Sequence, residues 1–435
     1  MIARPLVRSL VKPIVRGSVL TSGSILPSLD LAFALDKTLT ARRGPNPVLT
    51  RVQATSTGST YIGADKLIKY AAQNEPRFDH DPLTGVCKGL LIEEPRTNLA
   101  LQSENHSSES WSKTGVTVAS ATNTAPNGST TSNLVSEDSS TGLHRVFQST
   151  AYVSGTSYAI SVFLKYAGRQ FVAITHPAVA SNNLAIFDIQ NGSVTLQQSG
   201  ITASMVQCLN GWWRCIVNGV SSMTSSQSHI IQGSTTGGSL TGSYLGLNGP
   251  AFYIYGSQVE AGGFATSYIP TTTGTAVRSA DVCSIYDAAF AGLWNNSEGS
   301  LFASGDIRAG GTAPVTYVMA NSGANANQIA IFRNTGSISY GVANSGSYTA
   351  NITTPSVNGS FNKIAGSYFT NDARAAFNSV LGNPDDSVVV PTNLTRLNIG
   401  SSGAASSEFA NGCIASLQYY RKRLPNAKLQ TLTTL

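Results

Sequence analysis

The sequence FYIYGSQVEAGGFATSYIPT, residues 252–271, contains the clearest fold signal in this chain of 435 residues. Its first half combines aromatic and branched residues in an extended run, which is typical of a β-strand. Gly262, Gly263 and Pro270 then end that run. We interpret the stretch as the last strand of a β-sandwich leaving its sheet, and as a hinge to the next module. A comparable ending, GCIASLQYYRKR, occupies residues 412–423, so the chain is predicted to contain two β-modules in series.

The composition favours a mainly β protein with polar turns. Charged residues make up 11% of the chain, whereas about a quarter is usual in globular proteins. Hydrophobic residues make up 41%, which is enough to build folded cores. Strand signals recur at short intervals over residues 158–217 and again over 300–419, separated by Gly, Asn and Ser clusters. This spacing is typical of antiparallel sandwiches and jelly rolls.

Four parts are predicted along the chain: a basic N-terminal segment (1–45), a transition region (46–104), a jelly-roll module (105–273) and a second sandwich (274–435). Residues 1–45 contain seven Lys or Arg and two Asp, a net charge of +5, which leaves +1 for the rest of the chain. The body therefore lacks the charge of a nucleic-acid-binding face, and no nucleic-acid partner is expected.

A short repeat marks the N-terminus. RPLVRSLV at residues 4–11 is followed by KPIVRGSV at 12–19. Two prolines eight residues apart disfavour one straight helix, so we expect an extended peptide that docks on a partner; a disordered tail is the alternative. The cations interrupt every apolar run, which excludes a signal peptide, and no stretch is long enough for membrane insertion. The predicted docking residues are the cations that recur every four positions: Arg4, Arg8, Lys12 and Arg16.

Signals for catalysis are few. The five histidines are isolated, and the five cysteines show no metal-ligand spacing, so no catalytic residue, metal site or cofactor is expected. Buried free thiols are the preferred interpretation of the cysteines, although Cys208 and Cys215 could meet across a hairpin. Four carboxylate pairs stand beside turn residues and are interpreted as turn caps, with calcium at the last pair as an alternative. They are Asp79 with Asp81, Glu93 with Glu94, Glu137 with Asp138, and Asp385 with Asp386.

Aromatic side chains supply the candidate binding residues, because flat rings stack on the apolar faces of sugars. The alternative is that much of the set fills the sandwich core. Trp212 and Trp213 are adjacent in a predicted strand, so their side chains must point to opposite faces. The candidates for glycan binding are Trp212, Trp213, Tyr244 and Tyr255.

Two stretches resemble recurrent segments of tailed-bacteriophage structural proteins. They are GLLIEEPRTNL at residues 89–99 and GSQVEAGGFATSYIP at 256–270. NGWWR at 210–214 resembles the Gly-Trp-Tyr-Arg strand of jelly-roll carbohydrate-binding modules, with Trp213 where Tyr is usual. Residues 274–435 are similar to concanavalin A-like or laminin G-like sandwiches, although no calcium motif is evident.

The resemblance implies a virion fibre or spike protein, commonly a homotrimer that is assembled in the host cytoplasm. It further implies a non-enzymatic tail fibre that docks on a tail adaptor or portal-proximal protein through residues 1–45. Its outer modules would bind host polysaccharide or lipopolysaccharide for adsorption. A head fibre or decoration protein is the first alternative, and a polysaccharide-degrading tailspike is the second.

Overall fold

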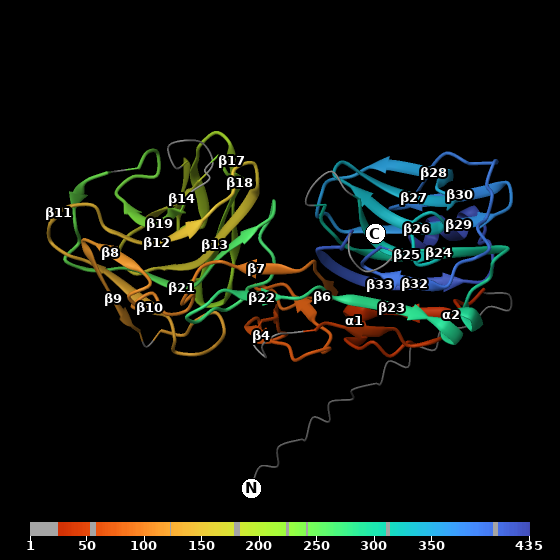
Figure 1. The fold of residues 1–435 in the computed structure, drawn as a ribbon, viewed down its shortest axis with the longest axis horizontal. Coiled ribbons are helices and arrows are strands. Elements are labelled where there is room, and N and C mark those ends of the chain that lie inside the picture. Colours follow the sequence, from red (N-terminus) through yellow and green to blue (C-terminus); the bar gives the residue numbers. More distant parts are fainter. Residues whose placement is uncertain are drawn as a thin grey trace, which may run out of the picture.

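The computed structural model of the chain consists of two β-sandwiches that lie side by side (Figure 1). Every strand pair in both sandwiches is antiparallel, which confirms the predicted mainly β fold with two antiparallel modules. The structure describes residues 25–52, 58–121, 123–177, 183–222, 226–240, 242–309, 314–402 and 408–435.

The first sandwich, on the left of Figure 1, contains two six-stranded sheets. One sheet has the spatial order β17 (Ile201–Gln207), β18 (Trp213–Val220), β13 (Ser157–Tyr166), β21 (Gly249–Ala261), β10 (Asn133–Glu137) and β9 (Val116–Ser120). The other has the order β16 (Ser193–Gln197), β15 (Asn183–Asp188), β14 (Phe171–His176), β19 (Ser226–Ser234), β12 (Arg145–Ala151) and β8 (Ser112–Thr114). A short ladder of β11 (Thr141–Gly142) with β20 (Tyr244–Leu245) and the 3-10 turn η1 (Leu209–Gly211) complete it.

The second sandwich also contains two sheets. The larger sheet has the order β31 (Val380–Leu381), β30 (Asp372–Phe377), β29 (Asn362–Phe369), β24 (Glu298–Asp306), β33 (Gly412–Tyr420), β6 (Cys87–Ile92) and β5 (Phe78–His80), and β1 (Leu29–Leu31) also pairs with β33. The facing sheet has the order β2 (Val48–Thr50), β23 (Val282–Tyr286), β32 (Arg396–Ile399), β25 (Val315–Asn321), β26 (Gln328–Asn334), β27 (Ser337–Asn344) and β28 (Ser347–Pro355). The helices are α1 (Phe33–Asp36), α2 (Asp287–Leu293) and α3 (Asn426–Leu432).

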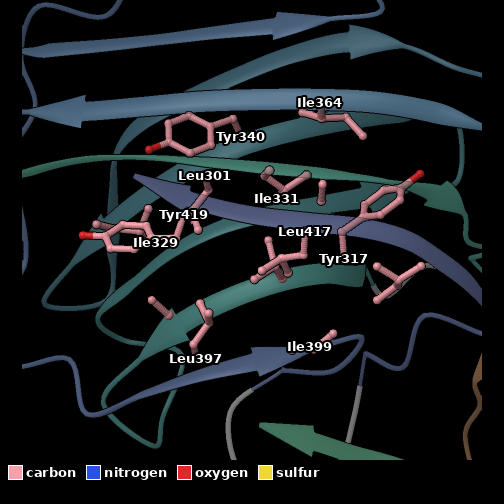
Figure 2. Packing of buried hydrophobic residues seen from close by; sticks show 14 of the residues in the cluster. Leu301, Tyr317, Ile329, Ile331, Tyr340, Ile364, Leu397, Ile399, Leu417 and Tyr419 are labelled. Carbon is pink, nitrogen blue, oxygen red and sulfur yellow. The ribbon is translucent and has the colours of Figure 1, made fainter. Parts of the chain in front are cut away.

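The core of the second sandwich lies between these two sheets. Figure 2 shows Leu301 and Leu417 of the larger sheet facing Ile331 of the other, and all three side chains are fully buried. In β26, Ile329 and Ile331 point into this core, whereas Ala330 between them belongs to a small cluster on the opposite face. This alternation is the period of two that a β-strand imposes on its side chains.

The strand pairing corrects the predicted domain boundaries. Strands β1, β2, β5 and β6 fall in the predicted basic segment and transition region, but they complete the two sheets of the second sandwich. The first sandwich is therefore an insertion between β6 and β23. Sequence patterns miss this because three of the four strands are only three residues long, too short for periodicity to register. The predicted basic segment 1–45 is therefore too long at its C-terminal end, and residues 1–24 lie outside the described residues.

The chain crosses between the sandwiches twice, and the two crossings pair with each other. Strand β7 (Arg96–Asn98) leads into the insertion and β22 (Ala276–Arg278) leads out of it, and the two form an antiparallel ladder. The hairpin of β3 (Thr60–Ile62) and β4 (Ile68–Tyr70) precedes β5. No helix in the described part of the chain is long and apolar enough to span a membrane.

Candidate ligand groove between the two sandwiches

The prediction that Trp212 and Tyr255 bind a glycan is wrong, because both side chains are inaccessible to a ligand. Trp212 and Tyr255 are both fully buried in one cluster beneath the β3–β4 hairpin. The Trp212 indole Nε1 donates to the carbonyl of Thr124 at 2.8 Å, and the Tyr255 hydroxyl donates to Glu104 at 2.7 Å. Rings that are packed and hydrogen-bonded in this way stabilise the fold and offer no face to a sugar.

Tyr244 is also a structural residue, and Trp213 is only partly accessible. The Tyr244 hydroxyl donates to Glu137 at 2.9 Å, and the Arg169 guanidinium lies 4.6 Å from its ring centroid. Burial, followed by the Glu137 charge, raises the pKa of Tyr244. Trp213 is half-buried against the core of the first sandwich, so it faces away from Trp212 as predicted. The predicted docking residues Arg4, Arg8, Lys12 and Arg16 lie outside the described residues.

The cysteines are free thiols, and four of them are buried, as predicted for small apolar side chains; Cys87 is only half-buried. Three of the carboxylates also have their predicted capping role. Asp81 accepts from the backbone N–H of Thr84 at 2.7 Å, and Asp138 and Asp385 accept from the serine two residues further on. Asp386 pairs with Arg374 at 3.0 Å. The described residues contain no group of three or more potential metal ligands.

Glu93 and Asp281 hold the junction together, although no sequence pattern identifies them as partners. Asp281 accepts from Arg51 at 2.7 Å and from Arg77, and all three side chains are fully buried. Glu93 accepts from Arg77 at 2.8 Å and lies 3.3 Å from Arg278. The interpretation of Glu93 as a turn cap is therefore wrong. Local sequence patterns cannot reveal this network, because Arg77 and Asp281 are 204 residues apart in sequence.

Glu93 also connects this ion-pair network to the inserted sandwich. Its carboxylate accepts from the backbone N–H and the hydroxyl of Ser267, both at 2.7 Å. Burial alone would raise the pKa of Glu93, but Arg278, Arg77 and Ser267 outweigh it and lower this pKa to about 2. The carboxylate is therefore ionised throughout the neutral range.

Residues 89–99 and 256–270 contact each other directly in this junction. The Asn98 side chain donates to the carbonyls of Ser257 and Ile269 at 3.1 and 2.7 Å, and it accepts from the N–H of Val259 at 3.0 Å. Gly262 has a φ of 142°, and a Cβ there would overlap the Arg96 guanidinium. Residues 252–271 are thus fastened to residues 93–98, and their interpretation as a hinge is wrong.

A groove opens beside this junction and is lined by both sandwiches. Its deepest part is a cavity of about 180 Å³. An adjoining hollow of about 460 Å³ shares Tyr61 and His80 with it, so the open space continues along the β3–β4 hairpin. The side chains that give the cavity its chemistry are Tyr61, Phe264, Asp79, Lys88, Arg214 and Asp306, with Arg308 also in its lining.

The charged groups of the groove differ in how well they are compensated. Asp79 accepts from the N–H of Ile62 at 2.7 Å, but burial raises its pKa to about 6. Lys88 lies 3.5 Å from Asp306. Within the described ranges, no carboxylate lies within ion-pair distance of Arg214 or Arg308. No local sequence signal identifies this set, because its members come from distant segments of both sandwiches.

Comparisons with known proteins leave the family open. No family model matches the chain, and no curated protein matches it.

Solved structures give weak similarities. A carbohydrate-binding module of Ruminococcus gnavus IT-sialidase, CBM40, is 15% identical with a TM-score of 0.29, covering 34% of this chain and 91% of that one. Mouse laminin α1 domains LG4-5 are 10% identical with a TM-score of 0.24, covering 67% and 88%. Trypanosoma rangeli sialidase with the inhibitor DANA is 10% identical with a TM-score of 0.28, covering 69% and 60%. With TM-scores this low, the fold assignment depends on the sheet topology itself.

Proposed function

We propose that this chain is a tailed-phage fibre protein that binds a host-surface glycan in the groove between its two sandwiches. The groove is the observation that supports this proposal, because it combines a cavity with half-buried rings and with polar side chains from both sandwiches. Sugar-binding sites need these two kinds of group: rings that stack on apolar faces, and charged or amide groups that bond hydroxyls.

The size of the cavity suits one sugar unit. A volume of about 180 Å³ corresponds to roughly six water molecules at the density of the liquid. The adjoining hollow along the β3–β4 hairpin provides room for neighbouring units of a polysaccharide. A single site of this kind binds weakly, and a fibre compensates by presenting several copies, such as the three of a homotrimer.

Titration of purified host polysaccharide or lipopolysaccharide against the full chain tests the glycan-binding role. Tyr61→Ala and Phe264→Ala remove the half-buried rings of the groove and should weaken binding about 2- to 10-fold each. Tyr286→Ala is the matched control, because this tyrosine is 41% exposed and lies outside the groove lining. Equal affinity of all four proteins would refute the groove as the binding site.

Attachment to the virion is assigned to the residues before β1. The basic repeats at residues 4–19 supply cations for an acidic surface on a tail adaptor or portal-proximal protein. Because Leu29–Leu31 already pairs with β33, deletion of residues 1–20 should leave both sandwiches folded but abolish incorporation into particles. Normal incorporation of the truncated chain would refute the docking role. Particle images that locate the chain would distinguish a tail fibre from a head fibre or decoration protein.

A polysaccharide-degrading tailspike is the second candidate, favoured by one observation. Asp79 and Asp306 both line the groove, and glycosidases use two carboxylates across the scissile bond. The raised pKa of Asp79, about 6, suits a general acid. Release of reducing ends from host polysaccharide, lost in Asp79→Asn, would establish this activity. Unshortened polysaccharide after incubation with the wild-type chain would exclude it for that substrate.

A further inference from the structure

Two arginines on the groove wall stand out because, in the part of the chain that the structure describes, no carboxylate lies within ion-pair distance of either. Arg214 comes from β18 of the inserted sandwich, and Arg308 follows β24 of the other sandwich. Each sandwich therefore contributes one arginine to the groove lining. Arg308 is exposed, whereas Arg214 is half-buried.

Arg214 is held in place by neutral groups. Its guanidinium lies 5.5 Å from the centroid of the Phe163 ring, and its Nη2 donates to the Ser161 hydroxyl at 3.0 Å. Its Nε is buried and has no hydrogen-bond acceptor among the described residues. The contact with the Phe163 ring and the hydrogen bond to Ser161 fix the position of the Arg214 guanidinium, but they leave some of its N–H donors without an acceptor.

The nearest carboxylates are already committed to other donors. Glu260 accepts from the N–H and the hydroxyl of Thr266 at 2.8 and 2.6 Å, and from Gln258 at 2.7 Å. Glu93 is paired with Arg77 and Arg278. Burial lowers the pKa of Arg214 despite the opposing charges of Glu260 and Glu93. By contrast, the pKa of Arg77 is raised, because Asp281 and Glu93 outweigh its burial.

The remaining charges of the groove do not supply the missing anion. Asp306 is paired with Lys88, and Asp79 accepts from the backbone of Ile62. The groove lining therefore contains three cations, Lys88, Arg214 and Arg308, and three carboxylates, Asp79, Glu93 and Asp306. Glu93 is already paired with Arg77 and Arg278, so it does not compensate the two groove arginines. A bound anion would be stabilised by the two arginines without displacing any ion pair that the structure shows.

We infer that the groove selects an acidic glycan, whose anionic substituent binds Arg214 with Arg308 at the exposed side. This inference depends on the proposed glycan-binding function and specifies its ligand class. A planar guanidinium fork matches the two oxygens of a carboxylate, as in a uronic acid, and it also matches a phosphate substituent. Neutral sugars offer hydroxyl and amide oxygens, which accept hydrogen bonds but carry no negative charge to compensate the cation on the wall.

Calorimetric titration of the full-length chain with three purified polysaccharides tests the inference: a polyuronate, a phosphate-substituted glycan and a neutral glucan. Binding of either acidic polymer should exceed binding of the glucan and should weaken as salt increases. Arg214→Gln and Arg308→Gln should each weaken acidic binding, about 10- to 100-fold for the half-buried Arg214. Arg214→Lys keeps the charge without the fork and should recover only part of the loss. Lys422→Gln, a change at an exposed cation outside the groove lining, serves as the control.

The titration results distinguish an error in the ligand class from an error in the glycan-binding function. If the glucan binds as well as the acidic polymers, with no effect of Arg214→Gln or Arg308→Gln, the ligand class is wrong but the glycan-binding function stands. If no polysaccharide binds, both are wrong. Because Arg308 is exposed, its substitution leaves the fold intact, so a folding defect in Arg214→Gln does not prevent the comparison. Preference between the two acidic polymers identifies the substituent as a carboxylate or a phosphate.

Discussion

Asp281→Asn is expected to destabilise the second sandwich strongly, because this carboxylate compensates two buried arginines. Asp281 Oδ1 accepts from Arg51, and Oδ2 accepts from Arg77 and from the N–H of Glu93 at 3.0 Å. Asparagine keeps the shape of the side chain but removes its charge and turns an N–H₂ toward an arginine donor. All three charged side chains are fully buried, so water cannot replace the lost partner.

The loss of stability in Asp281→Asn is large because Asp281 and its arginine partners are buried. Removing one partner of a buried ion pair costs about 3–5 kcal/mol. For a unit of about 200 residues, this free energy corresponds to a fall in Tm of about 6–20 °C. Asp36→Asn is the matched control, because Asp36 forms a similar pair with Arg42 whose side chains are 27% and 43% exposed. That change should cost less than about 1 kcal/mol.

Differential scanning calorimetry of the two variants and the wild type measures both effects. Urea unfolding provides a second measurement, in which the midpoint should fall without a change in slope. A fall in Tm for Asp281→Asn that is no larger than the fall for Asp36→Asn would show that the buried pair does not stabilise the fold. A loss confined to the second sandwich would show that the network stabilises this sandwich alone. A common loss in both would show that it couples them.

Three further predictions concern the junction and the groove. The folded pKa of Glu93, about 2, lies below its usual 4.5. The stability that the ionised carboxylate contributes is therefore complete above pH 4.5 and is lost as pH falls toward 2. In Glu93→Gln, the urea midpoint should change less with pH over that interval than it does in the wild type. The folded pKa of Asp79, about 6, lies above its usual 3.8, so the fold loses stability as pH rises from 3.8 to 6, and the loss is complete above 6. Asp79→Asn should therefore raise the urea midpoint at pH 7 but not at pH 3.5, and an unchanged midpoint at pH 7 would contradict this. Gly262→Ala should cost about 1–3 kcal/mol because of its φ and the overlap with Arg96, whereas Gly274→Ala, where nothing lies within 4 Å, should cost little in the same assay.

The sequence is a good guide to the sandwiches and a poor guide to the site. Strands such as Ser157–Tyr166 and Gly412–Tyr420 are long enough to show their type in local patterns. The predictions for Trp212 and Tyr255 are wrong because an aromatic residue in a predicted strand can equally well be buried or exposed. Both of these side chains are buried in the interior. Local patterns assign Glu93 to a turn because they do not connect it with the distant segments of its partners Arg77, Arg278 and Ser267.

The class of fold can be predicted from the sequence alone, since strand alternation, glycine-rich turns and a low charge content are local properties of the chain. The sequence also marked residues 89–99 and 256–270 as distinctive. Three features become visible only in the folded chain: these two stretches contact each other, the first sandwich is inserted into the second, and Arg214 and Arg308 share a groove. Burial and charge compensation depend on which distant segments meet, and sheet pairing across hundreds of residues sets which segments do so.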